Sequence, residues 1–163
     1  MIRIAEGIGK KVIINGRSMK QNVQIAENLG YFKFKKGTII SVQEMNKHKP
    51  DNILIISTGA QGEPNAGLMR IVNGDHKFIQ IQKGDTFIFS SSVIPGNERS
   101  VQTLTDNIAR QGAIVYNSKL IDIHKSGHAP QEDLKIVLDK IRPKYLVPVH
   151  AYYHFRFVAG QLG

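Results

Sequence analysis

The sequence predicts an α/β fold with a mainly parallel, doubly wound sheet. Short apolar runs rich in valine and isoleucine alternate along the chain with stretches of helical periodicity, and few residues separate one from the next. Strands joined through helices in this order run parallel, because the crossover is right-handed and returns the chain to the same edge of the sheet. Polar residues that follow the strands would therefore gather at one edge, where ligands bind in such sheets.

The predicted strands differ in their expected burial. Asn52–Ser57 is a continuous apolar run with several isoleucines, so we expect it to be fully buried. His76–Gln82 alternates apolar and polar residues, which predicts a strand with one exposed face. The other segments predicted as strands or short extended pieces are Lys11–Asn15, Thr38–Val42, Thr86–Ser90, Ala113–Tyr116, Ile121–His124 and Tyr145–His150.

The predicted helices begin and end at residues that favour helix ends. Ser18 would cap a helix over Met19–Leu29, which Gly30 would terminate. A second helix would begin near Glu63 and Pro64, since an acid and a proline both suit the first turn. The remaining predicted helices are a short piece at Gln43–Asn46, one from Asn97 or Ser100 to Gln111, an amphipathic one at Gln131–Ile141 that Pro143 ends, and an aromatic tail around Tyr152–Val158.

The composition is that of a basic globular chain. Of its 163 residues, 22 are Lys or Arg and 13 are Asp or Glu, which gives a formal charge of +9. A basic surface attracts polyanions by neutralising phosphates and releasing counterions, so two interpretations of the charge stay open with equal weight: nucleic-acid binding, or a basic surface that binds nothing. The chain has no apolar run of about 20 residues, no secretory signal layout and no cysteine, so we expect no membrane contact and a cytoplasmic location.

Five polar stretches would meet at the predicted sheet edge: Gly16-Arg17-Ser18, Gly59–Glu63, Ser91–Asn97, His124–His128 and His150. Thr58–Glu63 is glycine-rich, but Glu63 and Pro64 stand where a phosphate-binding loop needs a lysine and a hydroxyl. A tight strand-to-helix turn is therefore favoured over a nucleotide site. Ser91–Asn97 precedes a predicted helix, and two interpretations stay open for it: a phosphate site built on backbone N–H groups, or a turn with a helix cap.

Three histidines are the strongest candidates for chemistry. His124 and His128 lie four residues apart, but the Ser126-Gly127 pair between them disfavours a helical metal site. His128 precedes the predicted helix at Gln131–Ile141, and His150 ends the strand that follows it. One loop–helix–strand unit would bring these two imidazoles to the same sheet edge. His48 and His76 lie in or beside turns, where we expect solvated surface residues.

These motifs resemble the histidine motifs of β-CASP nucleases of the metallo-β-lactamase fold. The stretch His124-Lys125-Ser126-Gly127-His128, followed by a helix and by Val147-Pro148-Val149-His150, is similar to the two motifs that close the active site of that family. The segments that resemble bacterial and archaeal ribonuclease J are Gly16-Arg17-Ser18-Met19, Thr58 to Pro64, and Ile94 to Arg99. The matching segments follow one another in the family's order and cover nearly the whole chain.

The resemblance implies an enzyme that hydrolyses RNA with two zinc ions, as a 5′–3′ exonuclease, an endonuclease or both. It implies that His150 is a ligand of the second zinc and that His128 lies at the scissile phosphate, as general acid or electrostatic stabiliser. A pocket for the RNA 5′ end would include Ser126, Gly127 and Ala129. The further candidates for RNA contacts are His124, Arg17, Ser91, Gly96 and Asn97.

The chain departs from the family pattern in its metal motif. His-x-His-x-Asp-His occurs nowhere in the sequence, and Ala151-Tyr152 stands where family members commonly have Gly-Glu. Because one histidine cannot hold a zinc pair, we expect a fragment that is inactive alone. It would comprise a β-CASP domain at 1–123 and a returning segment of the metallo-β-lactamase domain at 124–163.

The expected protein partner of this fragment is the remainder of the metallo-β-lactamase domain. Without it, we expect the aromatic tail at Tyr152–Val158 to be partly exposed or to form a homodimer. Two other functions stay open at this point: a non-catalytic RNA-binding module, and a flavodoxin-like nucleotide-binding domain.

Overall fold

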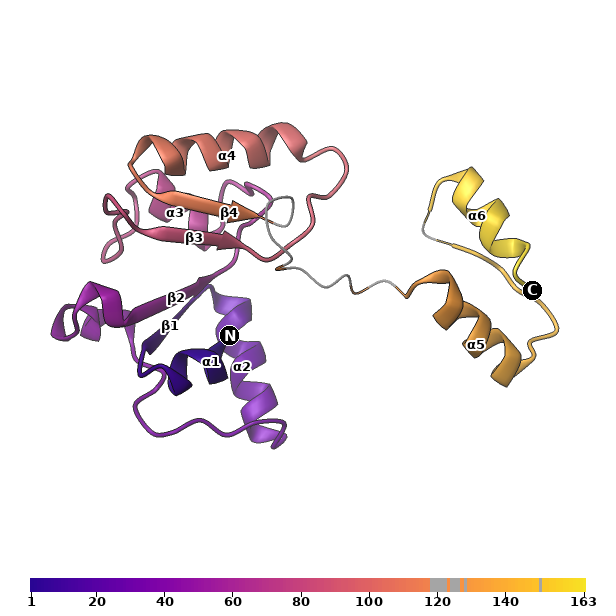
Figure 1. The fold of residues 1–163 in the computed structure, drawn as a ribbon, viewed down its shortest axis with the longest axis horizontal. Helices are drawn as coiled ribbons and strands as arrows, with labels where there is room; N and C mark the ends of the chain where they lie inside the picture. Colours follow the sequence, from indigo (N-terminus) through magenta and orange to yellow (C-terminus); the bar gives the residue numbers. More distant parts are fainter. Residues whose placement is uncertain (118–122, 124–126, 128, 150) are drawn as a thin grey trace. The chain divides into compact units, whose positions relative to one another are not determined.

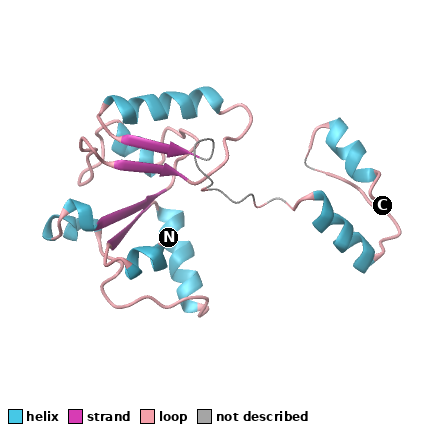
Figure 2. Cartoon of the chain, viewed as in Figure 1, coloured by secondary structure: helices cyan, strands magenta, loops and turns pink. Residues whose placement is uncertain are grey.

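Two short parallel sheets organise the first part of the chain. The computed structural model describes residues 1–117, 123, 127, 129–149 and 151–163, in two units, Met1–His124 and Lys125–Gly163. In the first unit, β1 (Lys11–Asn15) pairs in parallel with β2 (Ile53–Ser57), and β3 (Thr86–Phe89) pairs in parallel with β4 (Ile114–Asn117) (Figures 1 and 2). The α/β class and the parallel pairing are confirmed. The described strands nevertheless form two sheets of two strands instead of one continuous sheet.

A helix follows each of the first three strands, as the predicted alternation requires. These helices are α2 (Arg17–Asn28), α3 (Gly67–Val72) and α4 (Glu98–Arg110). A short helix that was not predicted, α1 (Ile2–Gly7), precedes β1. Between α2 and β2 lie two 3₁₀ helices, Val42–Lys47 and Pro50–Asn52, the first of which confirms the predicted helical piece in that region. No helix in the described part of the chain is long and apolar enough to cross a membrane.

β1 is the most deeply buried of the described strands. Val12, Ile13 and Ile14 are at most 5% exposed, and their β-branched side chains pack well on a pleated surface. Residues of three neighbouring elements complete this core: Ala5 of α1, Met19 and Val23 of α2, and Leu54 and Ile56 of β2. The prediction that β2 is fully buried is wrong, because all five of its residues keep intermediate exposure.

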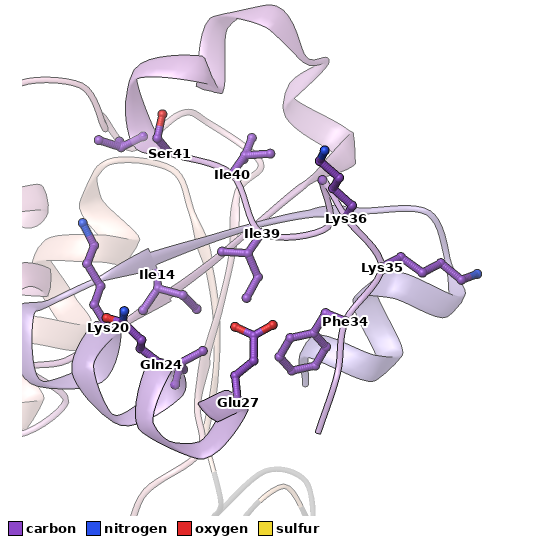
Figure 3. Close-up of a pocket in the computed structure, with 13 residues that line it drawn as sticks. Ile14, Lys20, Gln24, Glu27, Phe34, Lys35, Lys36, Ile39, Ile40 and Ser41 are labelled. Atoms are coloured by element: carbon purple, nitrogen blue, oxygen red, sulfur yellow. The ribbon is translucent and has the colours of Figure 1, made fainter. Parts of the chain in front are cut away.

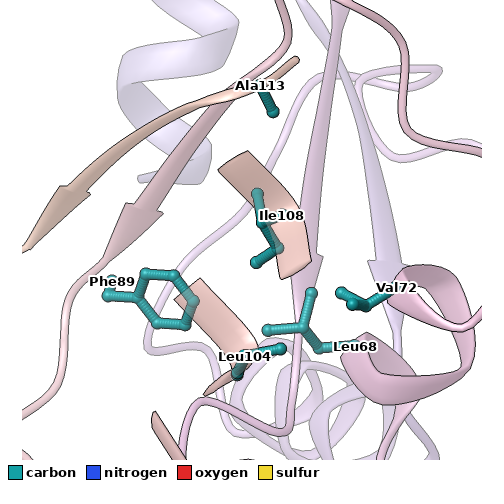
Figure 4. Packing of buried hydrophobic residues seen from close by; sticks show 6 residues of the cluster. All are labelled: Leu68, Val72, Phe89, Leu104, Ile108 and Ala113. Atoms are coloured by element: carbon teal, nitrogen blue, oxygen red, sulfur yellow. The ribbon is translucent and has the colours of Figure 1, made fainter. Parts of the chain in front are cut away.

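α4 covers the second sheet with one apolar face. Leu104 and Ile108 are four residues apart, lie on the same side of the helix, and are 1% and 0% exposed. They pack with Phe89 of β3 and with Ala113, just before β4 (Figure 4). Leu68 and Val72 of α3 complete the cluster. The predicted helix is confirmed here, because helical periodicity and the burial of its apolar stripe agree.

The beginnings of two helices were wrongly predicted. Ser18 lies inside α2, and Gly16 takes the cap position, because the turn after β1 needs a positive φ. α3 begins at Gly67 instead of Glu63, since the carboxylate of Glu63 accepts a hydrogen bond from the backbone N–H of Gln61 at 3.2 Å and stays in the loop. Gly30, with φ +76°, follows the end of α2 as predicted.

Thr38–Val42 is not a strand, although it touches β1. Val12 N donates to Thr38 O at 2.8 Å and Ile40 N donates to Val12 O at 2.9 Å, which makes one isolated bridge. The ladder stops there because Ser41 and Glu44 form a capping box that turns the chain into the 3₁₀ helix.

His76–Gln82 is a turn instead of the predicted strand. The Nδ1 atom of His76 accepts hydrogen bonds from the backbone N–H groups of Phe78 at 3.3 Å and Ile79 at 3.0 Å. These bonds bend the chain and carry Ile79 into the interior, where it is 4% exposed. The expectation of a solvated His76 is therefore wrong. Burial of the ring, helped by the charge of Arg70, lowers the pKa of His76.

The described part of the second unit contains two helices, α5 (Gln131–Ile141) and α6 (Tyr153–Gly160), which confirm both predicted helices. Arg142, in the left-handed conformation, and Pro143 end α5. The described residues of Tyr145–His150 are not a strand, because no strand in the described part of this unit is available to pair with them, and Pro148 lacks an N–H donor. No residue of either helix is buried.

The aromatic tail of the second unit is exposed, as expected from the sequence. Tyr152 and Tyr153 are each 76% exposed, and Phe155 is 63% exposed. The apolar face of α5 is also open, with Val137 at 50% and Ile141 at 69%. Such contiguous apolar surface is typical of a region that another surface covers.

The role of His76 predicts how stability depends on pH. Its folded-state pKa is lower than the ordinary value of 6.5, so protonation is more favourable in the unfolded chain. The stabilisation is therefore complete above pH 6.5 and is lost as the pH falls through the folded-state pKa. His76→Asn keeps an acceptor for the two N–H groups without titrating, and should flatten the decline in thermal midpoint between about pH 7 and 5.

His76→Ala removes the acceptor and should cost about 1 kcal/mol of unfolding free energy at neutral pH, measured by urea titration. His48→Asn is the matched control. An H76N protein with the same pH dependence as the parent chain would contradict this role for the ring.

Candidate functional site

The carboxyl ends of β1 and β2 are joined by polar side chains. Asn15 faces Ser57 in the strand register, and Asn15 Nδ2 donates to Ser57 Oγ at 3.1 Å. Ser57 Oγ donates to Thr58 O at 3.2 Å, and Thr58 N donates to Asn15 O at 3.3 Å. The pairing therefore continues past the strands and positions the loops that follow both of them.

Two glycines at this edge are required by close contacts. Gly16 has φ +120°, and a Cβ atom there would lie 2.7 Å from Thr58 Oγ1. Gly67 lies on the other side of the same bonds, and its Cβ would lie 2.8 Å from Asn15 Nδ2. The chain after β2 thus returns onto the strand ends, and a side chain at residue 67 would displace Asn15 or Ser57 from the bond between them.

A polar depression of about 590 Å³ opens between the starts of α2 and α3 at these strand ends. Its charged lining residues are Arg17 and Arg70, which are both exposed, and no acidic residue lines it. α2 begins here at Arg17, so the N-terminus of its dipole adds positive potential. The uncharged lining residues are Asn15, Gly16, Ser18, Gln21, Thr58, Asn65, Ala66 and Gly67. We call this depression the arginine cleft; its chemistry suits an anion with several oxygen acceptors, such as a phosphodiester.

Gln61 connects the loop after β2 with the loop after β3. Its Nε2 atom donates to Ser92 O at 2.8 Å, and its Oε1 atom accepts from Ile94 N at 2.9 Å. Asn97 Nδ2 also approaches Gln61 Oε1, at 3.5 Å. Gly62, with φ +77°, packs against Ser100 at the start of α4. The predicted convergence of these two loops is therefore present, although their strands belong to different sheets.

Backbone N–H groups of the Ser91–Asn97 loop already have partners inside the chain. Gly96 N donates to Glu98 Oε2 at 2.9 Å, and Asn97 N donates to Ile94 O at 2.9 Å. Asn97 occupies the cap position of α4 without a side-chain cap bond. Of the two interpretations left open by the sequence, the turn that precedes a helix describes this geometry, while the part of Ser91, Gly96 and Asn97 in RNA contact stays a prediction.

The predicted site residues fall in three groups. Arg17 lines the arginine cleft. Ser91, Gly96 and Asn97 lie in the loop after β3, which Gln61 joins to the loop after β2. Gly127 and Ala129 belong to the second unit and are exposed. His124, Ser126, His128 and His150 lie outside the described residues, so the expected meeting of His128 and His150 stays a prediction.

Arg70 and Gln61 were not found from the sequence. Arg70 lies on α3, four residues after Ala66, and only the true start of that helix at Gly67 places it at the cleft. Gln61 is one residue in a glycine loop and has no sequence signal of its own. A basic residue in the first helix after a strand-end glycine loop is the one feature that could have drawn attention to Arg70.

Metal ligands are not clustered in the described part of the chain. No group of three or more His, Asp or Glu residues there lies close enough to hold an ion. The residues that the structure describes therefore do not offer a donor set for zinc.

Sequence models of two domain families match this chain in succession. The "Ribonuclease J, beta-CASP domain" model matches residues 1–108, and the "Zn-dependent metallo-hydrolase RNA specificity domain" model matches residues 113–155. The first match alone covers most of the chain. The chain belongs to the ribonuclease J β-CASP family of metallo-hydrolases.

Curated relatives agree with this assignment. The chain is 44% identical over 154 residues to "Ribonuclease J 1" of Streptococcus pyogenes, which covers 94% of this chain and 28% of that protein. It is 42% identical over 141 residues to "Ribonuclease J" of Corynebacterium glutamicum, an alignment that covers 86% of this chain and 20% of that protein. It is 37% identical over 157 residues to "Ribonuclease J2" of Bacillus subtilis, where the alignment covers 96% of this chain and 28% of that protein. The chain spans roughly a quarter of the length of these relatives.

The Gln61 bridge predicts a local change on substitution. Gln61→Ala removes the acceptor of the Ile94 N–H and the donor to Ser92 O, so each lost bond should cost about 1 kcal/mol. Hydrogen exchange at the Ile94 amide should become faster in this variant. Gln61→Glu keeps an acceptor for that amide and should preserve its protection.

Gln102→Ala is the control for these variants, because the Gln102 side chain donates to Asp106 within the same helix, on the exposed side of α4. Unchanged exchange at Ile94 in Q61A would show that the two loops are held by other contacts.

Proposed function

We propose that this chain is the RNA-handling part of a metal-dependent ribonuclease that hydrolyses phosphodiester bonds in RNA processing and decay. The observation that carries the proposal is the arginine cleft, which presents two guanidinium groups and no carboxylate at the ends of two parallel strands. Ligands of α/β sheets bind at such strand ends. The names of the matching relatives and of the RNA specificity domain support the same function.

The cleft has the donors that an RNA backbone requires. Arg17 and Arg70 can each form paired hydrogen bonds with phosphate oxygens, which a guanidinium does better than an ammonium group. Ser18 and Thr58 carry hydroxyl groups, and Asn15 and Asn65 carry amides, all suited to phosphate or ribose hydroxyl contacts. In this proposal Ser91, Gly96 and Asn97 contact the backbone farther along the strand.

The chemical step is assigned to residues of the histidine motifs. We propose His128 as the proton donor or electrostatic stabiliser at the scissile phosphate, and Ser126, Gly127, Ala129 and His124 as the surroundings of the RNA 5′ end. No described atom lies within 4 Å of a Cβ built on Gly127, so packing within the described chain does not demand glycine there. Close approach of a ligand to the backbone would explain it.

Zinc fits the name of the matched RNA specificity domain but not the described residues of this chain. His150 is proposed as one ligand, and the other ligands of two ions would come from outside this chain. We therefore derive no step of the reaction through the metal.

The chain is proposed to contain parts of two domains, a β-CASP domain at 1–123 and a returning metallo-β-lactamase segment at 124–163. The change from one unit to the next at His124 and the succession of the two family models support this division. The open apolar faces of α5 and α6 would be covered by the remainder of the catalytic domain, or by a second copy when that remainder is absent. The proposed location is the cytoplasm.

A non-catalytic RNA-binding module is the second candidate, because the arginine cleft is complete in a chain that lacks the His-x-His-x-Asp-His motif. The two candidates predict the same RNA binding but different activities when the sequence is extended. A reading frame that encodes the motif upstream of residue 1 would support the enzyme.

Substitutions in the arginine cleft test RNA binding. Arg17→Ala and Arg70→Ala should each weaken binding of single-stranded RNA regardless of sequence. Each should reduce the slope of log K against log salt by about 0.7, the value for one lost phosphate contact. Arg110→Ala, at the far end of α4, removes the same charge and should leave the slope nearly unchanged. Equal slopes in all four proteins, measured by fluorescence anisotropy, would remove the cleft from the proposal.

The activity of the chain alone tests whether cleavage needs metal ligands from outside these 163 residues. Incubation of 5′-phosphorylated RNA with this chain and zinc or manganese should give no cleavage, since the described residues hold no metal site. Robust cleavage that His128→Ala abolished would show that the 163 residues are sufficient for the reaction.

A further inference from the structure

A short segment after α2 consists of aromatic and basic residues. Residues 31–36 read Tyr-Phe-Lys-Phe-Lys-Lys, so every residue is either an aromatic ring or a lysine. Aromatic faces that stack on bases, combined with cations that follow the backbone, are the means by which proteins bind single-stranded nucleic acid. An apolar loop that packs into the core is the simpler explanation, but Tyr31 is 74% exposed. Phe34 keeps intermediate exposure, and its ring contacts that of Phe32 at a centroid distance of 4.7 Å.

The segment is held in a defined conformation by bonds to α1 and β1. Glu6 Oε1 accepts from Lys35 N at 2.6 Å and from Thr38 Oγ1 at 2.9 Å, and these bonds lower the pKa of the Glu6 carboxyl. Lys11 Nζ donates to Gly37 O at 2.7 Å. Because the anchors use the backbone of residues 35 and 37, the side chains of Lys35 and Lys36 are not consumed in holding the segment.

A depression of about 400 Å³ lies between this segment and α2. Figure 3 shows Lys20 and Gln24 of α2 on one side and Phe34, Lys35 and Lys36 on the other, with Glu27 between them. Ile14, Val23, Ile39 and Ile40 provide apolar lining. Its volume lies within the range of about 300 to 1,000 Å³ for ligand pockets, and its lining combines charged and apolar groups.

The charges of the depression favour a nucleotide over an apolar peptide. Lys20, Lys35 and Lys36 stand at its sides, and none of them forms an ion pair with a carboxylate among the described residues. Glu27 would repel a phosphate at the centre but can accept a hydrogen bond from a base N–H group. The arrangement therefore suits a base beside Phe34 with its phosphates at the lysines.

The N-terminal part of the first unit carries most of the charge of the chain. Residues 1–49 contain ten Lys and Arg against three Glu, a net charge of +7 out of the total of +9. Residues of α2 line both this depression and the arginine cleft, and Lys20 lies three residues, roughly 5 Å of helix axis, from Arg17. The two depressions share no lining residue.

We propose that the depression formed by Lys20, Gln24, Glu27, Phe34, Lys35 and Lys36 is a second contact for single-stranded RNA, which continues along α2 from the arginine cleft. The inference rests on the proposed function, since the strand it holds is the RNA that the cleft binds. Phe34 stacks on one base, and the three lysines neutralise neighbouring phosphates. A longer RNA therefore gains affinity from this second contact, whereas a dinucleotide bound in the arginine cleft is too short to reach it.

The test compares charge reversals of equal size in the full chain. The double variant Lys35→Glu with Lys36→Glu should weaken binding of a single-stranded RNA of about 12 nucleotides by at least tenfold, while binding of a dinucleotide stays within about twofold. Lys47→Glu with Lys49→Glu changes the net charge equally outside the depression and is the control.

Phe34→Leu keeps an apolar side chain but removes stacking, and should weaken binding of the longer RNA by about fivefold. Thermal midpoints check that each variant folds.

The outcomes separate this inference from the proposed function. Equal losses of affinity for the longer RNA in the lysine variant and in its control would overturn the second contact. The R17A and R70A variants would then still test the arginine cleft by themselves. A lysine variant that instead loses self-association in the absence of RNA and keeps its affinity for RNA would make the surface a protein interface. That result would also overturn the second RNA contact. A parent chain that binds neither RNA would contradict the proposed function itself.

Discussion

The hydrogen bond between Asn15 and Ser57 is the interaction on which the described site depends. It lies at the end of a strand whose three central residues are buried, so the donor and acceptor are held by the core and not by the loops. One such bond contributes only about 1 kcal/mol. Its importance is geometric, because Gly67 packs against Asn15 and Ser57 themselves, and Gly16 packs against the neighbouring Thr58. The two strand ends must stay together for these contacts to form.

Two kinds of basic surface meet along α2. The arginine cleft combines guanidinium groups, small polar side chains and a helix N-terminus, which is a rigid arrangement for oxygen acceptors. The neighbouring depression combines lysines with an aromatic ring and an apolar lining, which is more tolerant of the group it meets. These two surfaces together suit a nucleic-acid strand that is held at many points and still moves along the protein. Contacts with phosphates and with base faces allow this, because they do not depend on the sequence of bases.

The second unit illustrates what a segment lacks when its partner surface is missing. α5 and α6 both form, because their sequences have helical periodicity and suitable ends, yet neither buries a residue. The apolar residues that should form a core remain exposed, among them Ile141 and Tyr153. Local preference is thus sufficient for these helices, while their packing requires surface from outside the unit.

The sequence by itself determined the α/β class, the parallel strands β1 to β4 and the main helices, because periodicity and glycine positions are local properties of the chain. It also indicated Arg17 and the polar loops after β2 and β3. Only the tertiary structure decided that His76–Gln82 is a turn, since the ring of His76 takes the N–H groups that a strand would have offered to a neighbour. Arg70 and Gln61 entered the site in the same way: their roles arise where Gly67 and the loop after β3 come within bonding distance of residues far away in the chain, and no local pattern encodes that meeting.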